Sequence, residues 1–268
     1  MSTYVMSDLH GQLDAFNDLL EQTGFQPDKD QLFLLGDYVD WGPKSIELML
    51  RIIKMMEQGQ PVRCLLGNHD LLMRHVISHL DTKSEGWLEN LEDDEWYEWW
   101  RDNAGLETLL QYVSLSDYRR KKIKKFLKNL ELYIEDVCVG GRKYYLCHSV
   151  PFKKDITEPM PLLEHLFCRT SEYYFTPFRK THPDDIIVCG HTITHYYWTD
   201  RRNLKYEPCG DISITPHLDG DTFQVYYDAD ERFINLDCGG KMLGSPRYAA
   251  KLSCLRLDDL QAFYSTKM

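Results

Sequence analysis

Short, largely apolar runs recur along the chain, and each one stops at a turn-forming or polar residue. They cover residues 3–6, 32–35, 62–66, 144–146 and 186–189. Unbroken apolar runs of this length, bounded by turn signals, are typical of buried strands. Apolar residues recur at helical spacing after the first two runs, over residues 13–20 and 46–53. The repeat of strand, loop, helix and strand predicts an α/β fold.

The second half of the chain is richer in strand patterns. Residues 222–227, 232–236 and 252–257 alternate in the way of strands, so we expect two mixed β-sheets packed as a sandwich and flanked by helices. The sequence pattern over residues 71–130 or thereabouts predicts a helical insert or cap that carries several tryptophans among many acids. Since no linker, repeat or low-complexity tract interrupts the pattern, we expect residues 1–268 to form one domain.

Potential metal ligands follow the apolar runs in five blocks. Carboxyl ends of strands are where α/β proteins gather their ligand sites, so five such blocks point to one common centre. Asp, Asn and His offer oxygen and nitrogen donors that suit divalent ions such as Mn, Fe or Zn. The set predicts a two-metal phosphoesterase centre. The blocks are Asp8-Leu-His10, Gly36-Asp37-Tyr-Val-Asp40, Gly67-Asn68-His69-Asp70, Cys147-His148 and Gly190-His191-Thr192.

These blocks resemble the metallophosphoesterase superfamily, and within it the phosphoprotein phosphatase branch with its bacterial serine/threonine phosphatases and diadenosine tetraphosphatases. That branch is marked by Asp-x-His, Gly-Asp-x-Val-Asp-Arg-Gly, Gly-Asn-His-Glu and two isolated histidines. The likeness extends through residues 100–110 and the tail from residue 234 to 240 with residues 252–257, so it covers most of the chain. It implies the calcineurin-like fold of two sheets.

The resemblance also implies a role for each ligand. Asp8 and His10 would hold the first metal, Asp37 would bridge, and the second metal would be held by Asn68, His148 and His191. Two cations sharing a carboxylate neutralise phosphate oxygens and lower the pKa of a bound water. We therefore predict in-line attack on the phosphorus by a metal-bound hydroxide, without a phosphorylated enzyme.

Three further residues have expected catalytic roles by the same resemblance. His69 is the general acid that protonates the leaving oxygen, and Asp40 orients it. A carboxylate partner raises the pKa of an imidazole, which predicts a protonated His69. Arg169 matches the arginine that follows the first isolated histidine in bacterial members, and a guanidinium fork suits a phosphate clamp.

The chain departs from the family pattern at two motif positions. Trp41 stands where the motif has arginine, so either Arg74 or Lys44 would have to compensate, or the substrate is held differently. Asp70 replaces the usual glutamate and keeps the charge. His195 does not match the extra ligand of the wider superfamily, which would lie at position 193, so its role stays open.

Three functional classes follow. The first is hydrolysis of phosphomonoesters in the manner of serine/threonine protein phosphatases. The alternative is hydrolysis of dinucleoside polyphosphates, such as diadenosine tetraphosphate, or of another nucleotide, which Trp41 and the tryptophan-rich insert favour. A metal-dependent binding protein without turnover is disfavoured by the complete ligand set. The partner in either hydrolytic case is a phosphorylated substrate.

Composition and charge limit the kinds of partner and cellular location that we expect for the chain. The net charge of -11 argues against an extended nucleic-acid surface. Six cations crowd residues 119–125, yet apolar residues lie among and after them at helical spacing, which favours the solvated face of an amphipathic helix. No apolar run approaches membrane-spanning length, and the first residues lack the features of a secretory signal. Eight scattered cysteines without a Cys-x-x-Cys pair suggest a reduced, cytoplasmic setting.

Overall fold

Two five-stranded sheets form the centre of the fold in the computed structural model, which describes residues 1–80, 89–152, 162–169, 172–199, 222–228, 230 and 232–267. The first sheet has the order β10-β9-β1-β2-β3 and the second β4-β5-β6-β8-β7. The first contains β1 (Thr3–Met6), β2 (Gln31–Leu34), β3 (Val62–Cys64), β9 (Ser253–Arg256) and β10 (Gln261–Tyr264). The second contains β4 (Tyr133–Val139), β5 (Arg142–Cys147), β6 (Asp185–Cys189), β7 (Tyr226–Tyr227) and β8 (Phe233–Asn235).

Both sheets are mixed, with parallel strands adjoining antiparallel ones. Strands β1, β2 and β3 run parallel, and β9 and β10 continue that sheet in antiparallel pairing. In the second sheet β5, β6 and β8 run parallel, while β4 and β7 pair antiparallel at its edges. Parallel neighbours bring their carboxyl ends to the same edge of a sheet, so the loops that follow them are close in space.

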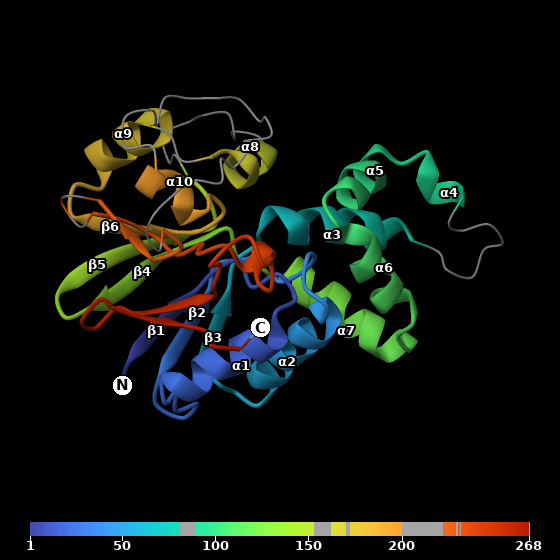
Figure 1. Cartoon of the computed structure of the whole chain (residues 1–268), viewed down its shortest axis with the longest axis horizontal. Coiled ribbons are helices and arrows are strands. Elements are labelled where there is room, and N and C mark those ends of the chain that lie inside the picture. Colours follow the sequence, from blue (N-terminus) through green and yellow to red (C-terminus); the bar gives the residue numbers. More distant parts are fainter. Residues whose placement is uncertain are drawn as a thin grey trace.

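Helices cover the outer faces of the sandwich. Figure 1 shows α1 and α2 beside the first sheet, α8 to α10 beside the second, and α3 to α7 projecting to one side. The helices of the first sheet and of the projection are α1 (Leu13–Gln22), α2 (Ser45–Glu57), α3 (Asn68–His79), α4 (Glu89–Glu92), α5 (Glu95–Asp102), α6 (Gly105–Val113) and α7 (Asp117–Lys128). The others are α8 (Leu162–Phe167), α9 (Glu172–Thr181), α10 (Thr194–Thr199) and the short 3-10 helix η1 (Gly240–Met242).

Three apolar clusters account for the layers. The cluster between the sheets joins Val5 and Phe33 of the first to Leu146 and Val188 of the second. A larger cluster packs the other face of the first sheet against α1, α2 and the insert, and a third packs the second sheet against α9 and α10. Burial of these side chains is the main favourable term in folding. The expected sandwich is confirmed, and the core shared by both sheets leads us to propose that residues 1–268 form one domain.

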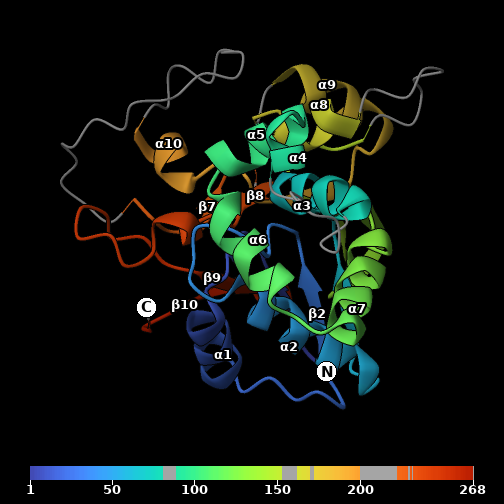
Figure 2. The same cartoon turned by 90° about the vertical axis from the view of Figure 1, so that its right-hand side faces the viewer.

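The insert is helical, as expected, over its described residues, which begin with α3 and run on through α4 to α7. Figure 2 turns the molecule so that these helices face the viewer. Helix α7 buries Ile123, Phe126 and Leu127 and turns most of its cations outward, which agrees with the predicted amphipathic helix. Trp87 lies outside the described residues.

Candidate metal centre

The five ligand blocks meet at the carboxyl ends of the parallel strands. Asp8 follows β1, Asp37 follows β2 and Asn68 follows β3, while His148 and His191 follow β5 and β6. The loops adopt unusual backbone conformations. Eight non-glycine residues of the described chain have positive φ, and six lie here: Asp8, His10, Asp37, Asp40, Trp41 and His191. Such conformations cost free energy and persist where the surrounding structure enforces them, often at functional sites.

Asp37 occupies the centre of the cluster. Its Oδ2 lies 3.7 Å from His10 Nε2, and its Oδ1 lies 3.6 Å from His148 Nε2. Two groups of ligand atoms that lie within 4.8 Å of one another share this carboxylate: His10, Asp37 and His69 in one, and Asp37, His148 and His191 in the other. A carboxylate common to two groups is suited to the bridging position that the sequence predicts for Asp37.

Two ring nitrogens converge on Asn68. His148 donates its Nδ1–H to the Leu35 carbonyl at 2.9 Å, and His191 donates its Nε2–H to the Phe167 carbonyl at 3.3 Å. The remaining nitrogen of each ring carries a lone pair and lies 2.9 Å from Asn68 Oδ1. Acceptors that face each other repel unless a cation is shared, and two ligands at right angles around one ion, each at ~2.1 Å, are about 3 Å apart. The donor set therefore fits a metal ion.

The charges of the cluster also fit cations. Burial raises the pKa of the carboxyl groups of Asp8, Asp37 and Asp237, and repulsion by neighbouring acids raises the pKa of Asp8 and Asp37 further. Burial lowers the pKa of His10 and His191, which keeps their rings neutral and able to ligate. Metal ions at this position would offset the repulsion among the buried acids.

Asp8 lies beside the cluster but in neither group of ligand atoms. Its carboxylate accepts the His191 backbone N–H at 2.9 and 3.1 Å and also the Ser7 hydroxyl. A β-carbon at Gly190 would collide with this carboxylate, so the loop after β6 requires glycine here. The pairing of Asp8 with His10 around one metal stays a prediction.

His69 and Asp40 form a buried pair. Asp40 Oδ2 lies 2.7 Å from His69 Nδ1 and accepts the Trp100 indole N–H at 2.8 Å. The Thr108 hydroxyl donates to Asp40 Oδ1 at 2.6 Å. The His69 ring lies 4.9 Å from the His10 ring, at the edge of the ligand cluster. With Nδ1 held by Asp40, Nε2 is the ring atom left to act on a substrate.

The expected raised pKa of His69 is wrong in direction. Burial, together with the charges of Lys241 and His148, lowers the pKa of His69 to about 3. The same burial raises the pKa of Asp40 to about 7. Desolvation outweighs the attraction between the partners, because both groups lie in the protein interior. Because Asp40 keeps its proton below about pH 7, its Oδ2–H donates to His69 Nδ1, and the neutral His69 ring carries its own proton on Nε2.

Arg169 follows α8 and lies near the second group of ligands. Burial is the main cause that lowers the pKa of His191, and the charge of Arg169 lowers it further. Burial raises the pKa of Asp237, and the charge of Arg169 acts against that shift. Its guanidinium carbon lies 5.6 Å from the ring centroid of Tyr196. Its Nη1 is buried and has no hydrogen-bond partner in the part of the chain that the structure describes. A buried donor without a partner is costly unless a ligand satisfies it, which suits a phosphate clamp.

Asp70 performs a structural task that the sequence left open. Its carboxylate accepts the backbone N–H groups of Asp37 at 2.8 Å, Tyr38 at 3.0 Å and Gly67 at 3.0 Å. It thus ties the loop after β2 to the loop after β3. The shorter side chain in place of the family glutamate still reaches all three donors.

Four residues near the site had no assigned role from the sequence. Asp237 follows the parallel strand β8, so the rule that located the other ligands also applies to it. Trp100 and Thr108 lie in the stretch that resembles bacterial family members, but their contact with Asp40 has no local signal. Lys241 lies over the Trp41 ring.

His195, whose role was open, contacts Thr222 Oγ1 at 2.6 Å and belongs to neither group of ligand atoms.

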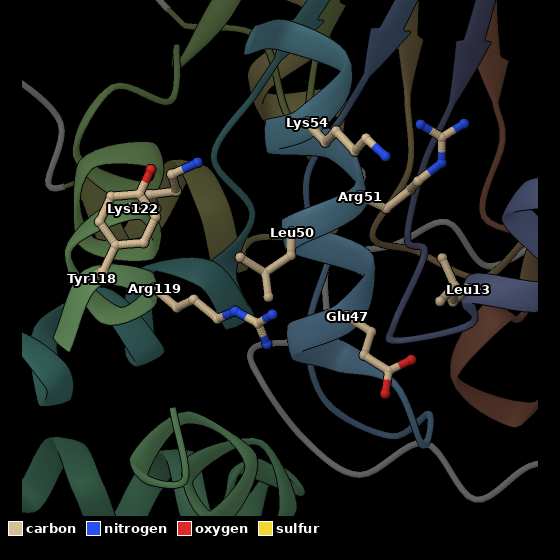
Figure 3. Close-up of a pocket in the computed structure, with 8 residues that line it drawn as sticks. All are labelled: Leu13, Glu47, Leu50, Arg51, Lys54, Tyr118, Arg119 and Lys122. Carbon is tan, nitrogen blue, oxygen red and sulfur yellow. The ribbon is translucent and has the colours of Figure 1, made fainter. Parts of the chain in front are cut away.

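A pocket between α2 and α7 is separate from this centre. Figure 3 shows its lining, which includes Leu50 and Tyr118 and the cations Arg51, Lys54, Arg119 and Lys122. Lys122 pairs with Glu57 at 2.8 Å. Exposed cations around a shallow apolar floor agree with a solvated helix face.

Comparison with known proteins identifies the family. The model of the calcineurin-like phosphoesterases matches residues 1–206. The chain belongs to the calcineurin-like phosphoesterase family. Membership makes it a metal-dependent phosphoester hydrolase, implies divalent metal ions, and agrees with the ligand groups above.

Bacterial relatives carry a more specific name. A symmetrical bis(5'-nucleosyl)-tetraphosphatase of Psychromonas ingrahamii is 44% identical over 87 residues, which cover 32% of this chain and 30% of that protein. One from Vibrio campbellii is 41% identical over 95 residues, 35% of this chain and 31% of its own length. The matches thus span about a third of the length of these curated relatives.

The fold is shared with solved phosphatases. A protein serine/threonine phosphatase from Saccharomyces cerevisiae superposes with a TM-score of 0.55 at 14% identity, covering 100% of this chain and 79% of its own. Identity at this level supports the fold alone. Among the described residues, no helix has both the length and the apolar character needed to cross a membrane.

Proposed function

We propose that this hydrolase acts on dinucleoside polyphosphates, with diadenosine tetraphosphate as the first substrate to test. The observation that carries the proposal is the indole of Trp41, which is 47% exposed and directly follows Asp40, the partner of His69. An exposed aromatic face beside a phosphate site suits stacking on a nucleobase. The names of the bacterial relatives support the same substrate class.

Separate side chains are expected to bind metal, bind phosphate and donate a proton. Asp8, His10, Asp37, Asn68, His148 and His191 would hold two divalent ions, Mn, Fe or Zn, which supply charge neutralisation at the phosphate and a lowered pKa for a bound water. Arg169 would bind a non-bridging phosphate oxygen through its unpaired Nη1. His69, held at Nδ1 by Asp40, would protonate the leaving oxygen from Nε2.

Hydrolysis of phosphomonoesters is the second candidate, and Arg169 favours it. A half-buried arginine whose buried Nη1 lacks a partner among the described residues, together with the His69–Asp40 pair, is sufficient to recognise a single phosphoryl group. A protein phosphatase of this fold needs nothing from a nucleobase. The two candidates therefore differ in whether Trp41 contributes to substrate binding.

A substrate panel with manganese separates the candidates. We expect diadenosine tetraphosphate to have a higher kcat/KM than a phosphoserine peptide, nitrophenyl phosphate or a cyclic nucleotide. A single turnover in heavy-oxygen water should place one solvent oxygen in a nucleotide product. Preference for the phosphopeptide would favour the second candidate, and a trapped phosphoenzyme would contradict direct attack by water.

Chelation followed by metal replacement tests the centre itself. Removing metal should abolish hydrolysis, and manganese should restore it. Asp37→Ala should be inactive at any metal concentration, because it removes the carboxylate common to both groups. Asp14→Ala is the matched control, since Asp14 is a surface acid that pairs only with Lys44 among the described residues. An active Asp37→Ala protein would refute the two-metal centre.

A further inference from the structure

Position 41 lacks the phosphate-binding arginine of the family motif. The family motif has arginine where this chain has Trp41, and an indole cannot donate a pair of hydrogen bonds to phosphate. Trp41 has positive φ and stands between Asp40 and Gly42 in a tightly packed loop. A cation that binds phosphate on this side of the centre would have to come from another part of the chain.

Lys241 lies in that place. Its Nζ is 5.6 Å from the centroid of the Trp41 ring. It belongs to η1, whose first residue, Gly240, packs so closely on the backbone of Asp8 that a β-carbon there would collide with the Asp8 carbonyl oxygen. Gln12 Nε2 also donates to the Gly240 carbonyl at 3.3 Å. These contacts fix the base of the lysine beside the first ligand loop.

The charge of Lys241 acts on several residues of the centre. Burial is the main cause that lowers the pKa of His10, His69 and His191, and the charge of Lys241 lowers the pKa of all three further. It acts in the same direction on Asp237. These residues belong to four different parts of the site, so the ammonium of Lys241 lies within electrostatic range of several of its side chains.

Of the two cations that the sequence offered, one is committed elsewhere. Lys44 pairs with Asp14 at 2.7 Å on the surface between α1 and α2. Arg74 is half-buried in α3, one turn beyond Asp70; burial lowers its pKa, and the charge of Asp70 acts in the opposite direction. Lys241, in contrast, has no carboxylate ion-pair partner among the described residues. Its ammonium is available to an anion.

We infer that Lys241 binds a non-bridging phosphate oxygen of the substrate, in place of the arginine absent at position 41, and that the Trp41 ring supports its ammonium. Arg169 and Lys241 then approach the substrate from separate loops, one after α8 and the other in η1. A cation resting on an aromatic face keeps its charge while losing part of its mobility. The inference rests on the proposed function only in requiring a phosphate-containing substrate.

Inorganic phosphate is the probe, because it binds without turnover. Lys241→Met keeps the length of the stem and removes the charge, and Lys241→Arg keeps the charge. Calorimetry on manganese-loaded protein should show phosphate binding weakened about 10- to 100-fold in Lys241→Met, the range for one lost charge-assisted hydrogen bond, and nearly retained in Lys241→Arg. The kcat/KM for nitrophenyl phosphate should fall by a similar factor.

Matched variants separate this role from a general effect of charge or packing. Lys44→Met tests the alternative cation, and Lys251→Met removes another lysine that lies over an aromatic ring, at 5.2 Å from the Tyr264 centroid. Both should bind phosphate as the unmodified chain does. Trp41→Arg added to Lys241→Met should restore most of the lost affinity, because it returns the family arginine.

Unchanged phosphate affinity in Lys241→Met, with manganese content and melting temperature unaltered, would overturn the inference that Lys241 binds phosphate. If Lys241→Met does not fold, Lys241→Gln replaces it under the same criteria. Failure of the proposed substrate is a separate result: a chain that hydrolyses nitrophenyl phosphate but no dinucleoside polyphosphate still allows the phosphate-binding test of Lys241.

Discussion

The Trp100 indole N–H donates to Asp40 Oδ2 at 2.8 Å, and this same oxygen lies 2.7 Å from His69 Nδ1. Trp100 belongs to α5, and Thr108, which donates to the other oxygen of Asp40, belongs to α6. The helical insert therefore orients the acid partner of His69 in addition to covering the first sheet. Two donors fix the carboxylate, and the carboxylate fixes the imidazole.

Trp100→Phe tests this connection. The variant keeps a ring in the core and removes the donor, so Asp40 loses one charge-assisted hydrogen bond. We expect kcat for a substrate with a poor leaving group to fall about 10-fold, within the range for such a bond. Trp96→Phe is the matched control, because Trp96 lies on the same helix and stacks on His75 at 4.1 Å. Equal losses in both variants would show that packing alone is responsible.

His69→Asn should distinguish substrates by their leaving groups. General acids contribute roughly 100- to 10,000-fold when the leaving oxygen needs a proton. An alkyl phosphate ester should therefore lose turnover by about that factor, whereas a nitrophenyl ester, whose leaving group departs without a proton, should lose much less. Steady-state kinetics on the two esters measure the ratio. Equal losses would contradict an acid role and point to a role in metal binding.

Asp237→Asn should separate metal affinity from stability. Asp237 is buried, and its charge helps to raise the pKa of Asp8 and Asp37. Removing that charge should raise the melting temperature of chelator-treated protein and lower its affinity for manganese. The reason is that the negative charge of Asp237 both repels the neighbouring acids and attracts the cations. The amide oxygen can still accept the Gly239 N–H, now at 2.9 Å. If the melting temperature and the manganese affinity are both unchanged, the charge of Asp237 does not contribute to the electrostatics of the centre.

Asp18 connects α1 to the last described residues. Its Oδ2 accepts the backbone N–H groups of Thr266 at 2.6 Å and Lys267 at 3.2 Å, and Gln22 Nε2 donates to it at 2.9 Å. Burial acts to raise the pKa of Asp18, but these hydrogen bonds outweigh it and the pKa is lowered. The resulting stability is present above the unfolded pKa of about 3.9 and is lost as pH falls through the folded value.

Asp18→Asn should therefore be pH-dependent in its effect. At pH ~7 we expect the free energy of unfolding to fall by about 1–2 kcal/mol, the value of hydrogen bonds to a charged acceptor. The difference from the unmodified chain should shrink as pH falls from the unfolded pKa of about 3.9 through the lower folded pKa, where the carboxyl group becomes protonated. Urea unfolding at a series of pH values measures it, with Asp14→Asn as a surface control. A difference independent of pH would assign the loss to packing.

Sequence patterns were sufficient to predict the sandwich and the edge where the ligands gather. Apolar runs specify which segments are buried strands, and parallel strands bring their following loops to one place. Asp37, Asn68 and His148 each follow such a run, which is why local spacing predicted their meeting. The same reasoning extends to Asp237 after β8. These features depend on residues within a few positions of one another.

The tertiary structure alone decided which residues surround the centre and how they ionise. Trp100 reaches Asp40 across 60 positions of sequence, and Lys241 reaches Trp41 from η1 near the other end of the chain. Neither contact leaves a periodic signal, because each depends on how separate helices and loops pack. The pKa of His69 has the same origin: Asp40 is visible in its motif, but the depth of burial that lowers the pKa to about 3 arises only when both sheets and the insert exclude water.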